Sequence, residues 1–377
     1  MQKRIRIVSI GIILIILLIS VIILNNNTNN KHTFKKDGIL YALSLDGEDI
    51  TAFPSKGLYK ANVSCEGADG KWLYDDWKLA IENITNDVSC DIKFETITKT
   101  YLNDYITGLA GTTQGTGQVV NENGYRYEGK NPNNYVWFNN EYWRIIGVFD
   151  SSSHGQTNKN LVKIIRADVL DSLAWHNSNT NDWTVASLNL LLNGAYYNAQ
   201  DGTDSGYCYG YSTRAMANCD YTKKGIQSGY RSMIAKVTWH LGGCSSNSPT
   251  AESFYGYERG TTVYSGRSTS TTGYIGLMYP SDYGYSVLSS SCARTLGLGN
   301  YGRKCVGQSW LYGKGPEWML TPNSSSSSEL FAFGNSGDAD KYDARFGNNT
   351  RPVLYLDASV YKIDGEGTVD KPYIIGM

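Results

Sequence analysis

The side chains in this chain that could do chemistry are few and scattered. Asp338, Asp340 and Asp343 form a D-x-D-x-x-D pattern in a stretch rich in Gly and Asn. Oxygen ligands at such short spacing could hold Ca²⁺, but the Gly and the final Glu of an EF-hand loop are missing. The pattern is more typical of a solvated polar loop. We therefore predict no metal site and no cofactor, and leave calcium binding by these three carboxylates open.

Catalytic arrangements are also weakly indicated. Glu252 and Glu258 flank Tyr255, and a carboxylate pair is the machinery of glycosidases, but one Glu pair in a Tyr-rich stretch is a poor signal. The histidines lack the spacing of a metal site or a Ser/His/Asp triad. We predict no catalytic residue and favour a protein that is not an enzyme. The histidines concerned are His154, His176 and His240.

The cysteines indicate an exported protein. There are seven, and none forms a C-x-x-C pair, which excludes a zinc ribbon or a thioredoxin-like site. Disulfides between cysteines that are neighbours along the chain are plausible, although sequence alone cannot fix which cysteines are bonded. Disulfides persist in oxidising compartments. The expected pairs are Cys65–Cys90, Cys208–Cys219 and Cys292–Cys305, and the role of Cys244 stays open.

The N-terminus also favours export. Three cations within residues 1–6 precede eighteen uncharged, mainly aliphatic residues, 7–24. Such a stretch can span a bilayer as one helix, and the positive-inside rule places the following chain outside the cell. The alternative is a cleaved signal peptide, but Asn25 to Asn27 follow in place of a small-residue cleavage site. We predict a single-pass cell-membrane protein, attached through residues 7–24, with its C-terminal domain extracellular.

The chain beyond this anchor (residues 1–24) divides into four predicted segments. Residues 25–37 are a polar stalk, and residues 38–98 alternate apolar and polar side chains, which predicts a small all-β domain of the Ig-like sandwich type. Cys65 and Cys90 fall on apolar strand faces, so we expect their disulfide to cross the core between two sheets. Residues 99–118 are a short helix and linker, and residues 119–377 form a large α+β domain. Within it, Asn139-Asn140 is expected to turn a hairpin.

Four motifs in the larger domain carry a resemblance. Gly124-Tyr-Arg-Tyr-Glu-Gly-Lys-Asn-Pro-Asn-Asn-Tyr135, Trp143-Arg-Ile-Ile-Gly147, Gly276-Leu-Met-Tyr-Pro-Ser-Asp-Tyr283 and Arg351-Pro-Val-Leu-Tyr-Leu356 resemble segments of exported surface proteins of unknown function from low-GC Gram-positive bacteria (Firmicutes). The stretch from Trp318 to Val353 is similar to the end of C-type-lectin-like domains of the formylglycine-generating and variable-protein kind. That resemblance implies two framing strands, which contain Trp318 and Arg351, and a ligand face between them.

These observations together predict a non-enzymatic surface protein that binds a glycan or a protein through its C-terminal domain, as an adhesin would. The near balance of 34 Lys+Arg and 35 Asp+Glu argues against a nucleic-acid partner. Two alternatives stay open: an exported glycan-active or formylglycine-generating-like enzyme, and a purely structural envelope protein. The expected ligand-binding residues are Phe331, Asp338, Asp340, Tyr342 and Arg345.

Overall fold

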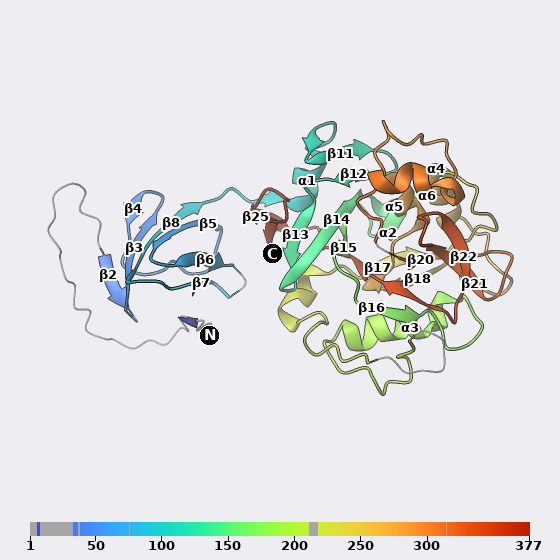
Figure 1. Cartoon of the computed structure of the whole chain (residues 1–377), viewed down its shortest axis with the longest axis horizontal. Helices are drawn as coiled ribbons and strands as arrows, with labels where there is room; N and C mark the ends of the chain where they lie inside the picture. The colour runs from blue at the N-terminus through green and yellow to red at the C-terminus, as the bar shows by residue number, and fades with distance from the viewer. Residues whose placement is uncertain (1–5, 8–32, 37, 75, 211–217, 314) are drawn as a thin grey trace. The chain divides into compact units, whose positions relative to one another are not determined.

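The chain separates into two compact units, Met1–Lys99 and Thr100–Met377. The computed structural model describes residues 6–7, 33–36, 38–74, 76–210, 218–313 and 315–377 (Figure 1). Strands dominate both units, with 39% of the chain in strand and 15% in helix. The abundance of Tyr (29) and Gly (40) fits this architecture, because aromatic residues favour strands and Gly shortens helices.

The predicted fold class is therefore wrong in its helical parts. The larger unit was expected to be α+β, but its described α-helices are at most eight residues long and lie among many strands. Across the described residues, no helix has the length and apolar character needed to cross a membrane. Residues 8–24 of the predicted anchor lie outside the described part of the chain. Arg6–Ile7 form a short strand, β1, rather than the start of a helix.

The first unit consists of two sheets around a shared core. One sheet has the order β1-β7-β6, and the other has the order β2-β3-β8-β5 with β4 against β3. Buried aliphatic side chains and rings such as Trp72 and Phe94, whose centroids are 5.0 Å apart, fill the core. Strand β3 runs parallel to β8, while β5 is antiparallel to β8. The strands are β2 (Thr33–Lys36), β3 (Ile39–Leu45), β4 (Glu48–Asp49), β5 (Tyr59–Glu66), β6 (Asp69–Leu73), β7 (Lys78–Glu82) and β8 (Val88–Thr96).

The disulfide of this unit lies within one sheet. Cys65 on β5 and Cys90 on β8 are bonded, which is the expected pair, and they are direct cross-strand partners with Cα atoms 4.1 Å apart. The expectation that this bond crosses the core between the two sheets is wrong. Both cysteines do lie on inward-facing positions, but the antiparallel register places them opposite each other on neighbouring strands. The bond therefore fixes the register of β5 on β8.

The second unit is built on an eleven-stranded sheet with the order β10-β11-β12-β14-β13-β26-β25-β9, to which β15, β24 and β19 are added through β14. Asn139 and Asn140 have φ values of 57° and 60°, which confirms the predicted hairpin turn between β13 and β14. The strands are β9 (Thr100–Tyr101), β10 (Thr113–Gln114), β11 (Thr116–Asn121), β12 (Tyr125–Asn131), β13 (Tyr135–Phe138), β14 (Glu141–Phe149), β15 (Leu161–Arg166), β19 (Ile275–Gly276), β24 (Val353–Tyr355), β25 (Tyr361–Asp364) and β26 (Tyr373–Gly376).

Smaller sheets and short helices complete this unit. A five-stranded sheet has the order β16-β23-β20-β21-β22, and β17 pairs with β18. Residues 99–118, expected as a short helix and linker, contain β9, α1 and β10 and enter β11. The remaining elements are β16 (Asp171–Ala174), β17 (Val237–His240), β18 (Ser270–Gly273), β20 (Glu317–Pro322), β21 (Glu329–Phe333), β22 (Ala339–Asp343), β23 (Gly347–Thr350), α1 (Leu102–Thr107), α2 (Ser151–His154), α3 (Ser187–Leu191), α4 (Ala251–Glu258), α5 (Pro280–Tyr285) and α6 (Gly302–Cys305), with short 3₁₀ and π turns between them.

The second unit contains two disulfides, Cys208–Cys219 and Cys292–Cys305, and Cys244 is a buried free thiol. We predict that peptide mapping of unreduced protein, isolated from the cells that make it, recovers these two links and Cys65–Cys90. Recovery of reduced cysteines at these positions would contradict both the bonds and the expectation of an exported protein.

Replacing both Cys65 and Cys90 by Ala should lower the unfolding free energy of the first unit by about 3 kcal/mol. The reason is that a disulfide between residues 25 positions apart restricts the unfolded chain.

Candidate functional site

The predicted ligand face corresponds to the β21–β22 hairpin, where β22 is an edge strand of the five-stranded sheet. Phe331 on β21 does not belong to any surface. Its side chain is 0% exposed, and its ring packs edge-on against Phe254 of α4 with centroids 5.1 Å apart. The expectation that Phe331 contacts a ligand is therefore wrong, because strand alternation directs this ring into the core.

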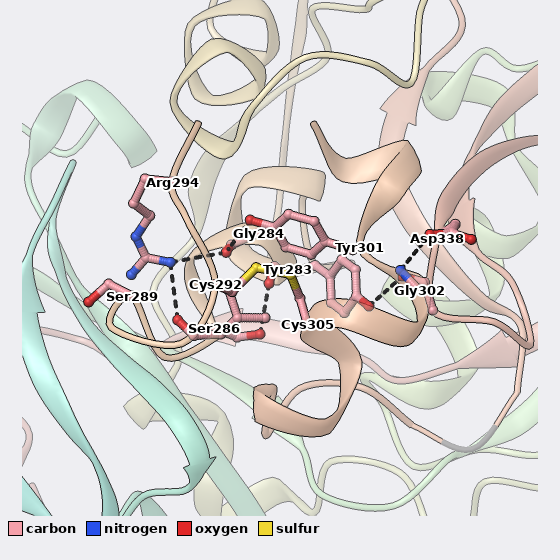
Figure 2. Close-up of a disulfide and its surroundings, with 12 residues drawn as sticks. Tyr283, Gly284, Ser286, Ser289, Cys292, Arg294, Tyr301, Gly302, Cys305 and Asp338 are labelled. Carbon is pink, nitrogen blue, oxygen red and sulfur yellow. Dashed lines mark hydrogen bonds between the residues drawn. A yellow bond between two sulfur atoms is a disulfide. The ribbon is translucent and has the colours of Figure 1, made fainter. Parts of the chain in front are cut away.

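Asp338 is engaged in holding a neighbouring loop. One carboxylate oxygen accepts a hydrogen bond from the backbone N–H of Gly302, where α6 begins, and the other accepts from the Ser336 hydroxyl at 3.0 Å. Figure 2 shows the hydrogen bond from Gly302 to Asp338 near the disulfide between Cys292 and Cys305, so Asp338 fastens the disulfide loop to the hairpin. A carboxylate used in this way is part of the scaffold.

The other three predicted residues lie along β22 and the turn that follows. Asp340 is exposed and accepts from the Asn247 amide at 3.5 Å, and Tyr342 is half-buried against the core. Arg345 donates two hydrogen bonds to Asp343, at 2.9 and 2.8 Å, and these bonds hold the pKa of Asp343 below its usual value. Charged groups along an edge strand commonly prevent unwanted strand pairing.

The framing residues and the carboxylate pattern can also be placed. Trp318 is buried and donates from Nε1 to the Leu173 carbonyl at 2.8 Å, while the Arg351 guanidinium is buried 2.7 Å from Glu317. Both belong to the interior. Among the described residues, no group of three or more His, Cys, Asp or Glu side chains is arranged to hold a metal ion.

The candidate catalytic groups are not assembled into a site. Glu258 is fully buried at the end of α4, whereas Glu252 in its first turn is exposed, so the two carboxylates do not face a common cleft. Burial raises the pKa of the Cys244 thiol, the opposite of what activates a nucleophilic cysteine.

A buried ionic cluster, which the sequence reasoning missed, lies at the junction of the large sheet and α5. Asp282 on α5 accepts from Arg126 Nη1 of β12 at 2.9 Å through Oδ1. Its Oδ2 contacts Lys163 Nζ of β15 and accepts from the backbone N–H of Tyr279 at 2.9 Å. All three charged side chains are 1% exposed. We call Arg126, Lys163 and Asp282 the ionic cluster.

The electrostatics of the ionic cluster follow from its burial. Loss of hydration lowers the pKa of Lys163 to about 8, against the opposing attraction of Asp282. Burial alone would raise the pKa of Asp282, but Lys163 and Arg126 outweigh that effect and hold it below its usual value. Aromatic rings surround the ammonium, with centroids 4.4 Å (Tyr279), 5.6 Å (Tyr355), 5.7 Å (Phe149) and 5.8 Å (Trp239) from Nζ.

Glu258 lies beside this cluster. Its carboxylate accepts from the backbone N–H and hydroxyl of Ser281 at 2.8 and 2.6 Å, and Arg259 lies 3.1 Å away. Complete burial raises the pKa of Glu258 to about 7 despite these partners. Two polar atoms at the edge of the same region, Arg126 Nη2 and Tyr355 Oη, are buried without a hydrogen-bond partner.

A signal for this cluster was present in the sequence. Arg126, Asp282 and Tyr355 each belong to one of the motifs quoted for the Gram-positive resemblance, and Lys163 interrupts the apolar run Leu161-Val-Lys-Ile-Ile165. A charged residue at an inward position of an apolar strand must find a partner. The partner could not be identified from spacing, because Arg126 and Asp282 are 156 positions apart.

A row of partly exposed aromatic side chains lies on the β13–β14 hairpin. Trp137 and Tyr142 are direct cross-strand partners with ring centroids 5.1 Å apart, and Tyr135 lies 6.0 Å from Tyr142. Tyr142 is 37% exposed and the other two are half-buried. The guanidinium of Arg144 lies 4.3 Å from the Tyr135 ring centroid and fixes its position. We call Tyr135, Trp137 and Tyr142 the aromatic shelf. Figure 1 draws this hairpin and the β21–β22 hairpin on opposite sides of the second unit.

The comparisons with known proteins give no relative: no protein-family model matches the chain, and no curated protein or solved structure matches it.

The raised pKa of Glu258 predicts a pH dependence of stability. Its pKa is about 7 in the folded chain and about 4.5 when exposed, so the folded state binds more protons between these values. The contribution of Glu258 to stability is therefore complete below pH 4.5 and is lost as the pH rises through 7. Between these limits the wild type should lose roughly 3 kcal/mol relative to Glu258→Gln, which does not titrate. Denaturant unfolding of both proteins across this range measures the difference, and parallel profiles would contradict the assignment.

Proposed function

We propose that this chain is an extracellular, non-enzymatic surface protein that binds a glycan through the aromatic shelf of its second unit. The three disulfides support an oxidising location, since such bonds do not persist in a reducing cytosol. Attachment to the membrane through residues 7–24 stays a prediction from the sequence.

The observation that carries the binding proposal is the aromatic shelf itself. Sugar rings present apolar C–H faces that pack on aromatic rings, and their hydroxyls bond to polar groups at the rim. Trp137 and Tyr142 offer ring surface on neighbouring strands, while the phenol groups of Tyr135 and Tyr142 add polar tips.

The shelf is better suited to this role than the face expected from the sequence. On the β21–β22 hairpin, Phe331 is buried and the carboxylates of Asp338 and Asp343 are engaged in bonds within the fold. The aromatic shelf, in contrast, is anchored by rigid strands and leaves ring surface exposed. A preformed rigid platform lowers the entropy cost of binding.

The alternatives have less support. An exported enzyme would need reactive groups that converge in an open cleft, whereas Glu258 and Cys244 are both buried. A protein ligand at the aromatic shelf is the other outcome that a binding experiment can distinguish.

The test is a glycan-array screen of residues 38–377, followed by titration of the strongest hit against three variants. Trp137→Ala and Tyr142→Ala should each weaken binding about tenfold or more, because each removes ring surface from a small interface. Tyr342→Ala, on the face expected from the sequence, should bind as the wild type does.

The matched control is Tyr257→Ala, which removes a tyrosine of similar exposure (43%, against 37% for Tyr142) from α4. It should leave affinity unchanged. Loss of binding in Tyr342→Ala with retention in Tyr142→Ala would move the site to the β21–β22 hairpin. If the array shows no bound glycan and a protein partner binds at the aromatic shelf instead, the shelf is a protein-recognition site and the glycan proposal is wrong.

A further inference from the structure

We propose that Lys163 and Asp282 join covalently, through an amide (isopeptide) bond between Nζ of the lysine and Cγ of the aspartate. This proposal concerns the interior of the second unit and does not depend on the glycan-binding role of the aromatic shelf.

The first support is geometric. Lys163 Nζ contacts Oδ2 of Asp282, and both side chains are 1% exposed. Lys163 projects from β15 and Asp282 from the first turn of α5, and both backbones are fixed, β15 by its pairing with β14 and β24. Reactive groups held in contact by a rigid fold gain a large effective concentration, which lowers the entropic part of the barrier to amide condensation.

The second support is the surroundings of the pair. Rings of Phe149, Trp239, Tyr279 and Tyr355 enclose the ammonium and exclude water from it. Burial lowers the pKa of Lys163 to about 8, so at pH 7 roughly one amine in ten is unprotonated and nucleophilic. Exclusion of water also opposes the reverse reaction, which is hydrolysis of the amide.

The third support is the set of donors on the carboxyl group. Arg126 Nη1 holds Oδ1 at 2.9 Å, and this oxygen would carry the negative charge when the amine adds to Cγ. The backbone N–H of Tyr279 bonds to Oδ2, the oxygen that contacts the lysine. A guanidinium aimed at a developing oxyanion stabilises the tetrahedral intermediate, as an oxyanion hole does.

The step is balanced without any further reagent. One ammonium proton first passes from Nζ to the contacting Oδ2, which frees the Nζ lone pair and gives a neutral acid. The lone pair then forms the N–C bond, a second proton passes from the nitrogen to Oδ2, and the bond from Cγ to Oδ2 breaks. The ammonium of Lys163 begins with three protons; two leave with Oδ2 as one molecule of water, and one remains on the amide nitrogen. Two opposite charges disappear, so the net charge of the region is unchanged. The desolvation cost of the ammonium and the carboxylate is removed, while Arg126 loses its counter-ion and keeps Oδ1, now the amide oxygen, as its hydrogen-bond acceptor.

The test is mass spectrometry of the whole chain after reduction, alkylation and digestion with trypsin. Trypsin does not cleave after an acylated lysine, so the link predicts one branched product that joins residues 160–166 to residues 268–294. Its mass should be lower than the sum of the two peptides by one water. Fragmentation should place the branch at Lys163 and Asp282.

Two controls make the result decisive. Lys163→Met removes the amine and should abolish the branched product, with residues 268–294 recovered alone. The pair Lys78 and Asp76, whose N–O distance is 2.6 Å, has side chains that are 19% and 58% exposed. It is in contact with water and should show ordinary cleavage after Lys78 in the same digest. Recovery of residues 160–163 and 268–294 as separate, unmodified peptides from the wild type would overturn the proposal and leave the pair as an ion pair.

Discussion

The second unit depends on one buried carboxylate more than on any other group. As the chain folds, before any bond joins Lys163 to Asp282, the Asp282 carboxylate compensates two cations, Arg126 and Lys163, in a region that water does not reach. An isolated charge in such surroundings costs several kcal/mol, so none of the three side chains can be buried unless the others are in place. Because they come from β12, β15 and α5, the chain must bring these elements together, and α5 is thereby fixed against the large sheet.

Similar pairs repeat this arrangement elsewhere in the second unit. Arg294, in the loop closed by Cys292–Cys305, pairs with Glu128 of β12. Arg351, which precedes β24, pairs with Glu317 of β20. Pairs of this kind do not always stabilise a fold more than apolar residues would, but they specify which partners can be buried together. We interpret the interior as a core in which apolar packing supplies the stability and charge pairing selects the arrangement of long loops around it.

The sequence predicted those features that depend on neighbours along the chain. The Asn139-Asn140 turn follows from residues that tolerate positive φ, and disulfide pairs of cysteines 11 and 13 positions apart follow from proximity. It did not predict that Cys65–Cys90 lies within one sheet, because strand alternation gives the face of a residue but not its neighbour. Phe331 was misplaced for a different reason: a ring among Ser and Asp residues was expected to be exposed, whereas strand alternation directs it into the core. The ionic cluster needs contacts between segments more than a hundred positions apart, and no local pattern encodes them.

The central claim is that Asp282 holds the second unit together, and its direct measure is the unfolding free energy of Asp282→Ala compared with Asp340→Ala. Both variants remove one aspartate carboxylate. Asp282→Ala leaves two buried cations without a counter-charge, whereas Asp340→Ala changes an exposed side chain. We expect Asp282→Ala to lose about 3–5 kcal/mol and Asp340→Ala to change by less than about half a kcal/mol. Equal and small losses in the two variants would contradict the account.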